Sequence, residues 1–192
     1  MSKEIRMKLE YGLLISCKKN FESAAASELS FAFTNNFEIS KSNFKIKRLG
    51  ISGLVNAKLN DEIDVIKLIH DIKSLENDKV FFVHCLKFKP LQYIVDSNID
   101  DIAKCVENLI PFEGTYRISV NRRHTSITSK EIITKIANVV PNKVNLENYD
   151  FNIVIEIVAE LTGISLLKPN DIYTTKKAFE SIGDNKDTNW FL

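Results

Sequence analysis

Residues 115–137 read TYRISVNRRHTSITSKEIITKIA, and two patterns in this stretch decide the fold of the second half of the chain. The first part alternates as a half-buried β-strand does, with one apolar face and one polar, basic face. The second part has Thr128 and Glu131 at the spacing of a capping box, which predicts that a helix begins there. The apolar face of the strand holds Tyr116, Ile118 and Val120, and the polar face holds Arg117, Ser119, Asn121 and Arg123.

The segments on either side complete an α-β-α-β-β order. Ser97 is followed three residues later by Asp100, as in a capping box, so a helix is expected to begin there. The helix that begins at the quoted capping box is expected to end before Pro141. Two strands are expected at residues 152–160 and 163–167. The two helices should bury Ile99, Ile102, Ala103, Val106 and Leu109, and Ile132, Ile133, Ile136, Ala137 and Val140.

The first half of the chain has a different order, β-α-β-β-α-β. Strands are expected at residues 12–17, 44–49, 54–59 and 80–88. Helices are expected after the first and the third strand, the second of them capped by Asp61. This order is that of the ferredoxin-like fold. We therefore predict an α+β protein, with a ferredoxin-like domain at residues 1–96 followed by an α/β domain at residues 97–172.

Residues 173–192 are expected to form a polar, partly disordered tail, because they contain no periodic apolar pattern. The tail ends in three apolar residues, Trp190, Phe191 and Leu192. Two interpretations of this ending stay open. It folds back onto the body of the protein, or it is a peptide that a partner binds.

Composition excludes several classes of protein. The chain has 26 basic and 25 acidic residues, so its net charge of +1 says nothing about a partner. The cysteines Cys17, Cys85 and Cys105 have no close pair, which indicates buried thiols in a reducing compartment rather than disulfides or a zinc site. The apolar run at residues 11–17 is too short for a signal or membrane-spanning helix. We therefore expect a soluble, cytoplasmic protein that binds neither a membrane nor a metal.

No catalytic or cofactor-binding motif is recognisable. The six glycines form neither a G-x-G-x-x-G nor a Walker-type phosphate loop. The histidines His70, His84 and His124 are scattered, and there is no nucleophile elbow and no carboxylate pair among apolar residues. We expect that the protein is not an enzyme and needs no cofactor; an enzyme with an unrecognised site is the alternative.

Basic residues gather in two places although the total charge is balanced. In the quoted stretch, arginines, hydroxyls and the first turn of a helix together favour a phosphate group. The alternative is that these arginines pair with Glu131 or Glu156 within the protein. The anion-site residues are predicted to be Arg117, Asn121, Arg122, Arg123, His124, Ser129 and Lys130, with Lys143 and Lys168 at the same edge. The second gathering, in the first half, is Lys18, Lys19, Lys45, Lys47 and Arg48.

The quoted stretch, with KVNLENYD at residues 143–150 and IVIEIV at residues 153–158, resembles the core of a THUMP domain. In that family the domain binds tRNA-like RNA, often at its acceptor end, and commonly follows a ferredoxin-like domain. The resemblance implies that residues 97–172 are an RNA-binding THUMP domain. Aromatic residues that could stack on bases are sparse there, since Tyr116 and Phe151 look like core residues, so we expect the domain to read the shape and backbone of tRNA more than its sequence. DNA is not expected as a partner. The lysines and arginine of the first half would then supply additional RNA contacts.

Other segments resemble the stand-alone THUMP proteins that act as adaptors in tRNA cytidine acetylation. These are LLIS and NFE at residues 13–16 and 20–22, GISGLV at residues 50–55 and LTGISLLKPNDI at residues 161–172. The resemblance implies a non-catalytic protein that presents tRNA to a separate RNA cytidine acetyltransferase. Two alternatives stay open: a specificity subunit for another tRNA modification enzyme (thiolation or methylation), and a scaffold whose basic edge meets an acidic protein.

Overall fold

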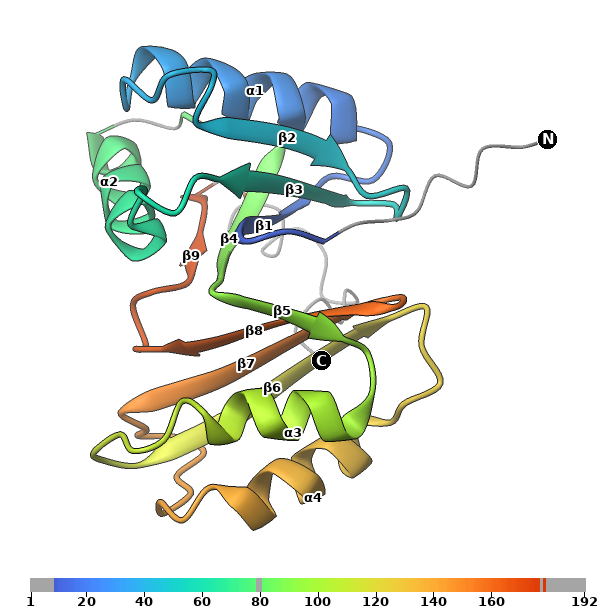
Figure 1. Cartoon of the computed structure of the whole chain (residues 1–192). Helices are drawn as coiled ribbons and strands as arrows, with labels where there is room; N and C mark the ends of the chain where they lie inside the picture. Colours follow the sequence, from blue (N-terminus) through green and yellow to red (C-terminus); the bar gives the residue numbers. More distant parts are fainter. Residues whose placement is uncertain (1–8, 79–80, 177, 179–192) are drawn as a thin grey trace, which may run out of the picture. The chain divides into compact units, whose positions relative to one another are not determined.

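The computed structural model describes residues 9–78, 81–176 and 178 (Figure 1). Within these residues the chain is a mixed α/β protein with two sheets and four helices, which confirms the mixed α and β class expected from the sequence. The chain divides into two compact units. We call Tyr11–Pro90, with the described residues from 170 on, the first unit, and Leu91–Pro169, with residues 9–10, the second unit.

The first unit has a five-stranded sheet in the order β2-β3-β1-β4-β9. Strand β3 pairs antiparallel with both β1 and β2, and β9 pairs antiparallel with β4. Both helices pack on this sheet through buried residues such as Leu29, Phe33, Ile69 and Ile72. The elements are β1 (Gly12–Cys17), α1 (Glu22–Asn35), β2 (Phe44–Arg48), β3 (Leu54–Leu59), α2 (Val65–Asp78), β4 (Cys85–Leu91) and β9 (Tyr173–Thr174).

The second unit has a four-stranded sheet in the order β5-β8-β7-β6. Strands β6 and β7 run parallel, whereas β5 and β7 each pair antiparallel with β8. Helices α3 and α4 lie on one face of this sheet, and isoleucines such as Ile132, Ile136, Ile153 and Ile155 form the core between them (Figure 1). The elements are β5 (Tyr93–Asp96), α3 (Ile99–Glu107), β6 (Tyr116–Arg123), α4 (Ser129–Val139), β7 (Phe151–Val158) and β8 (Leu161–Leu167).

The capping residues agree with the sequence at one helix and differ at two. Helix α4 begins with the predicted capping box: the Thr128 hydroxyl accepts from the Glu131 amide, and the Glu131 carboxylate accepts from the Thr128 amide. Helix α3 is capped by Asn98 rather than Ser97, because the Asn98 side chain accepts from the amide three residues on, that of Asp101. At α2 the corresponding carboxylate is Asp64 rather than Asp61, and it accepts from the amides of Ile66 and Lys67.

Two further expectations are corrected by the packing. The strand expected at residues 80–88 is β4, which begins only at Cys85. The Glu28 carboxylate accepts from the amides of Val83, His84 and Cys85, and these bonds hold that segment outside the sheet. Along α4, Ile133 and Ala137 are exposed, because the buried stripe is narrow and follows Ile132, Ile136 and Val140.

The compact units have boundaries at residues 10/11, 90/91 and 169/170, whereas the sequence placed domain boundaries at 96/97 and 172/173. The difference arises from two short strands. Residues 93–96 form β5, which pairs with β8 of the second unit, and Tyr173–Thr174 form β9, which pairs with β4 of the first. Trp190, Phe191 and Leu192, with most of the expected tail, lie outside the described residues. None of the helices described is both long and apolar enough to cross a membrane.

Candidate nucleic-acid interface

Strand β6 carries four of the predicted site residues, and its pairing with β7 shows how they are divided between the faces of the sheet. Ile118 lies beside Ile153, Val120 beside Ile155, and Arg122 beside Ile157. Because side chains alternate along a strand, Arg122 shares the face that α3 and α4 cover. Arg117, Asn121 and Arg123 lie on the opposite face. The neighbours Arg122 and Arg123 are therefore on different sides of the sheet.

Arg122 lies beside the start of α4. Its Nη1 donates a hydrogen bond of 2.8 Å to the main-chain oxygen of Ile127. The pKa of the Glu131 carboxyl lies below its ordinary value, first because Thr128 donates hydrogen bonds to it and to a smaller extent because of the Arg122 charge. Arg122 thus fixes the loop before α4 as well as carrying an exposed positive charge.

Arg123 and Asn121 share a buried carboxylate on the other face. Asn121 Nδ2 donates to Glu156 Oε1 at 2.9 Å, and Arg123 Nη1 lies 3.6 Å from Glu156 Oε2. The Glu156 side chain is fully buried, whereas that of Arg123 is 33% exposed. This is the pairing that the sequence left open as the alternative to an anion site. The Arg123 charge therefore has an internal counter-charge before any ligand arrives.

The loop after β6 joins this end of the strand to α4. His124 follows β6 with a positive φ of 55°, which turns the chain away from the strand. The Thr125 hydroxyl accepts from the Ile127 amide and closes the loop. Ser129 and Lys130 are the first two residues of α4. The structure thus brings Arg122, His124, Ser129 and Lys130 to one end of the second unit, around the start of α4.

Arg117 lies at the opposite end of β6, about 20 Å from Arg123 at the usual rise of a strand. Its guanidinium carbon is 4.8 Å from the centroid of the Tyr149 ring. Its Nε and Nη2 donate to the Ser119 hydroxyl at 3.3 and 3.1 Å. In contrast to Arg123, the contacts that fix Arg117 are with neutral groups, a ring face and a hydroxyl, which leave its positive charge uncompensated by them.

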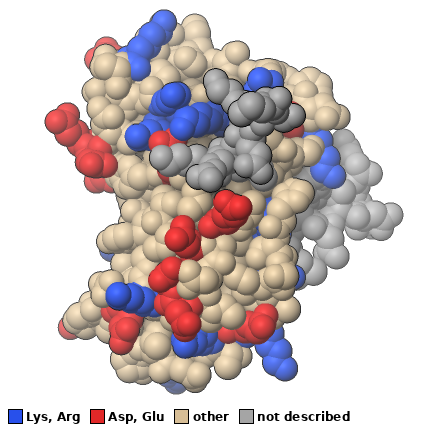
Figure 2. All heavy atoms as spheres, turned by 45° about the vertical axis from the view of Figure 1, so that its right-hand side comes forward, with Lys and Arg blue, Asp and Glu red and all other residues tan. Residues whose placement is uncertain are grey.

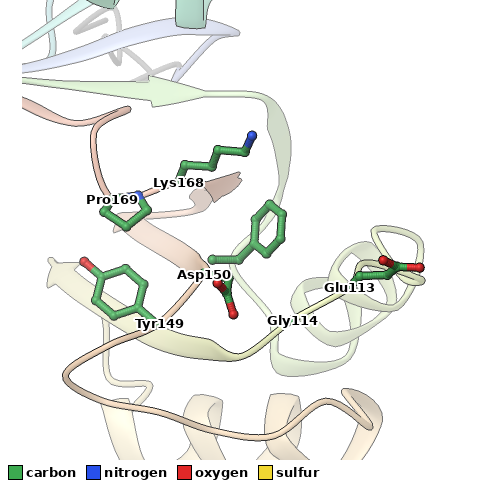
Figure 3. Close-up of a pocket in the computed structure, with 7 residues that line it drawn as sticks. Glu113, Gly114, Tyr149, Asp150, Lys168 and Pro169 are labelled. Carbon is green, nitrogen blue, oxygen red and sulfur yellow. The ribbon is translucent and has the colours of Figure 1, made fainter.

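Tyr149 and Lys168 line an open hollow of about 570 Å³ at this end of the unit (Figure 3). Three segments build the hollow: the loop before β6, the loop before β7 and the end of β8. The hollow carries acidic as well as basic side chains, so it is not by itself an anion site. The lining residues are Glu113, Gly114, Tyr149, Asp150, Phe151, Lys168 and Pro169.

Asp150 braces this end. Its Oδ2 accepts from the amide and the hydroxyl of Thr115, at 2.7 and 2.8 Å, and these two bonds lower the pKa of its carboxyl. The bracing requires glycine at position 114, where φ is +111° and an added Cβ would lie 2.7 Å from Asp150 Oδ2. Lys143 is also near this end, because its main-chain oxygen accepts from the Tyr116 amide. Its side chain is exposed.

The additional basic residues lie in the first unit. Lys45 and Lys47 are on one side of β2, and Arg48 is on the other side, where it donates to the Ser23 hydroxyl of α1. Lys45 lies directly opposite Lys58 of β3. Like charges directly opposite each other are unfavourable for the pairing of two strands. Lys58 places a further positively charged side chain next to Lys45. Lys18 and Lys19 are in the loop between β1 and α1.

Sequence reasoning overlooked Lys58 and Tyr149. The alternation of residues 54–59 could have placed Lys58 on the same side as Lys45, but the pairing of the two strands was needed to put them opposite each other. Nothing in the sequence indicates that Tyr149 lies under Arg117, because 32 positions separate them.

Figure 2 shows Lys and Arg side chains on the drawn face as separate small groups, with Asp and Glu side chains among them. The described residues contain no group of His, Cys, Asp and Glu arranged to hold a metal ion.

Comparisons with known proteins agree with this geometry at the level of the domain. Residues 96–167 match the family model of the THUMP domain, so this segment is a THUMP domain. It runs from the last residue of β5 to the last residue of β8 in the second unit. A search of curated proteins found no match.

Several solved structures share the fold of most of the chain. The crystal structure of PH1313 from Pyrococcus horikoshii OT3 is similar with a TM-score of 0.57 and 19% identity, over 81% of this chain and 54% of that one. TrmN from Thermus thermophilus is similar with a TM-score of 0.54 and 12% identity, over 82% and 46%. A 4-thiouridine synthetase, solved as an RNA complex with bound ATP, is similar with a TM-score of 0.53 and 13% identity, over 83% and 42%. The chain thus spans about half the length of these proteins.

Proposed function

We propose that this chain, whose residues 96–167 are a THUMP domain, binds tRNA and presents it to a separate RNA cytidine acetyltransferase without having a catalytic site of its own. The THUMP domain is the observation that carries the proposal. The fold shared with a 4-thiouridine synthetase that was solved with RNA supports RNA as the ligand. The acetyltransferase as partner rests on the resemblance of residues 13–22, 50–55 and 161–172 to the adaptor proteins of that reaction.

The first unit supports the same proposal. Its elements follow in the order β1-α1-β2-β3-α2-β4, and the first four strands of its sheet lie in the order β2-β3-β1-β4. We assign this arrangement to the ferredoxin-like fold, which accompanies THUMP domains in the family that the sequence resembles. The segment at residues 50–55 includes most of the turn between β2 and β3 and the first two residues of β3, and Gly50 and Gly53 in the turn have positive φ values of 72° and 78°.

The charges along β6 allow the arginines of the proposed RNA contact to be ranked by their expected contribution to binding. Phosphate contacts need cations whose charge is not already neutralised by the protein. Arg117 contacts a hydroxyl and a tyrosine ring, whereas Arg123 faces the buried Glu156 carboxylate. Both arginines lie on the same face of the same strand, at its opposite ends. We therefore expect Arg117 to contribute more to RNA binding than Arg123.

A matched pair of variants tests the RNA contact. Arg117→Ala and Arg123→Ala remove the same side chain from the same strand face, so their effects on bulk charge are equal. Affinity for tRNA should be measured across a salt series, because log affinity falls linearly with log salt according to the number of phosphate contacts. We expect Arg117→Ala to flatten this slope by roughly one and Arg123→Ala to flatten it less.

Arg122→Ala/Arg123→Ala, compared in the same series, tests the residues around the start of α4. Equal slopes for the wild type, Arg117→Ala and this double variant would move the RNA site away from β6. Wild-type protein that binds no tRNA at moderate salt would overturn the proposed function, and the scaffold interpretation would then lead.

The acetylation role has its own test. Cells that lack the gene should lose acetylcytidine from their tRNA and keep the other modified nucleosides. Purified protein should give no turnover when incubated with tRNA and either acetyl-CoA or S-adenosylmethionine. Turnover with either donor would contradict the absence of a catalytic site.

The second candidate is a specificity subunit for another tRNA-modifying enzyme. The fold shared with a 4-thiouridine synthetase favours thiolation as the first of these reactions to check. The same survey of nucleosides separates the candidates, because loss of thiouridine with intact acetylcytidine would select the second.

A further inference from the structure

Phe21 and His84 form an aromatic stack in the first unit, in which Phe21 is exposed and His84 is half-buried. Their ring centroids are 5.0 Å apart and the ring planes differ by 12°, so the two rings lie face to face. Phe21 is 46% exposed and is not part of the hydrophobic core of this unit. Val83, next to His84, is 45% exposed. A flat aromatic surface is thus presented to solvent at the start of α1.

The need to form α1 does not explain Phe21. It occupies the residue before the helix, where Ser, Thr, Asp and Asn are preferred because their side chains can accept from first-turn amides. Phe21 cannot do so, and α1 has no side-chain hydrogen bond at this cap. A large apolar side chain that neither caps the helix nor enters the core leaves apolar surface in water, which is unfavourable for folding.

The two rings are held by a rigid backbone. The Glu28 carboxylate accepts from the amides of Val83, His84 and Cys85, at 2.7, 3.1 and 3.0 Å. The His84 main-chain oxygen accepts from the Lys18 amide, and the Phe21 amide donates to the Lys18 main-chain oxygen. Both rings are therefore tied through Lys18 to one turn, and a ligand that stacks on them would pay little to order the surface.

Basic side chains precede the stack, and the nearby acids are engaged elsewhere. Lys18 and Lys19 lead directly into Phe21 in the loop after β1. The Glu22 carboxylate accepts from the amides of Gly53 and Asn20, and the first of these bonds is the main reason that its pKa is lowered. Glu28 is bound to three amides. Both carboxylates are therefore held by main-chain amides, and Lys18 and Lys19 supply positive charge next to the exposed ring.

We propose that Phe21 and His84 form a stacking platform for an unpaired nucleobase of the RNA, with Lys18 and Lys19 beside the adjoining phosphates. This inference rests on the proposed function only in taking RNA as the ligand. Aromatic and histidine faces stack on unpaired bases, and basic side chains beside them hold the backbone. A surface for docking a protein would instead be a broad apolar patch; here the exposed apolar surface is one ring and the adjoining Val83.

The chain offers a matched control for Phe21. Phe31 lies within α1, is 59% exposed and has no ring partner among the described residues. Phe21→Ala and Phe31→Ala therefore delete the same side chain from exposed positions, one just before α1 and one within it, and only the first removes the stack. Phe21→Trp retains a flat aromatic face and should keep the platform. Thermal unfolding of each variant shows whether the fold is preserved.

The affinity for tRNA should be measured for these variants together with that for a single-stranded RNA containing 2-aminopurine, whose fluorescence falls when the base stacks. We expect Phe21→Ala to weaken binding of the single-stranded RNA about tenfold and to abolish the quench, whereas Phe21→Trp and Phe31→Ala behave as wild type. The salt slope of Phe21→Ala should equal that of the wild type, because no phosphate contact is lost.

Three outcomes would overturn the platform. In the first, the wild type binds tRNA and Phe21→Ala binds both RNAs with the same affinity as the wild type. This result would refute the stacking platform and leave the proposed function intact. Phe21→Ala could bind RNA normally but fail to support acetylation by the enzyme, which would make the stack a protein-docking site. Wild-type protein that binds neither RNA would overturn the proposed function and the platform together.

Discussion

The two ends of strand β6 carry arginines on the same face but use them differently. At the carboxyl end Arg123 lies 3.6 Å from the buried carboxylate of Glu156, which also accepts from Asn121. At the amino end Arg117 lies over the Tyr149 ring and donates to a hydroxyl. The density of basic residues in the sequence is higher at the carboxyl end. The Arg123 charge lies beside a buried carboxylate, whereas the contacts that fix Arg117 are with neutral groups.

Cations that are neighbours in the sequence supply less charge to one anion than their number suggests when they lie on a β-strand. Alternation places Arg122 and Arg123 on opposite faces, so they cannot both point at one phosphate. Arg123 lies beside the Glu156 carboxylate, whereas Arg122 donates to the main-chain oxygen of Ile127 and makes only a small contribution to the lowered pKa of Glu131. A cation adjacent to an internal carboxylate contributes less to binding a polyanion than its formal charge suggests.

The largest effect is expected from Glu156→Ala, which breaks the arrangement at the carboxyl end. Removing the buried carboxylate leaves Arg123 without its counter-charge and Asn121 without its acceptor. Because Arg123 is one-third exposed, the main loss is that of the hydrogen bond from Asn121 to the buried carboxylate, which costs about 2 kcal/mol of the free energy of unfolding. Urea denaturation of the variant and the wild type measures this loss. At a temperature where the variant stays folded, its affinity for tRNA should be higher than that of the wild type, because Arg123 no longer faces the Glu156 carboxylate.

Glu156→Gln is the control for that experiment. The amide has the same shape and can still accept from Asn121, so only the charge is lost. We expect a smaller loss of stability than for Glu156→Ala. Equal stability of the wild type and Glu156→Ala would mean that the contact between Arg123 and Glu156 contributes nothing, and the contrast between the two ends of β6 would disappear.

Thr128→Ala is expected to have the next largest effect. It removes the hydroxyl that accepts from the Glu131 amide and donates to the Glu131 carboxylate at the start of α4. Loss of a helix cap of this kind costs about 1 kcal/mol. Thr128→Ser keeps the hydroxyl and should be close to wild type in thermal unfolding. If both variants unfolded at the same temperature, the capping box would not stabilise this end.

The elements of the fold could largely be predicted from the sequence, whereas the grouping of the site residues could not. The alternation at residues 116–121 and the capping box at Thr128 are local signals, and β6 and α4 lie where these signals place them. The predicted start of β4 was wrong because Glu28, more than 50 positions away, accepts from the amides of Val83 and His84 before the strand. The contact of Arg117 with Tyr149 likewise depends on tertiary structure. Contacts between distant segments leave no periodic trace in a single sequence.

Tyr149→Leu tests the amino end of β6 and should have a small effect. Leucine retains much of the apolar volume but removes the ring face over which the Arg117 guanidinium lies. A cation–π contact at a partly exposed site contributes about 0.5 kcal/mol. The midpoint temperature of thermal unfolding should therefore fall only slightly. Affinity for tRNA should fall as well, because Arg117 loses the surface that orients it; Tyr149→Phe, which keeps the ring face, should match the wild type in both measurements.

The smallest effect is expected from Glu131→Gln, and it should appear as a pH dependence. The pKa of Glu131 in the folded protein is lowered from its ordinary value of 4.5 by the hydrogen bonds from Thr128. A lowered pKa means that the carboxylate stabilises the fold above pH 4.5 and that this contribution is lost as the pH falls through the lower, folded-state value. Glutamine keeps the shape and one acceptor but has no charge to lose.

The wild type should therefore be slightly more stable than Glu131→Gln at neutral pH, and the difference should vanish in acid. Asp150 at the other end of β6 has its pKa lowered in the same way by Thr115, so Asp150→Asn should show the same convergence with the wild type. Denaturation at a series of pH values measures both. A difference that stays constant from pH 7 into acid would show that the shape of the carboxyl group, and not its charge, braces each end of the strand.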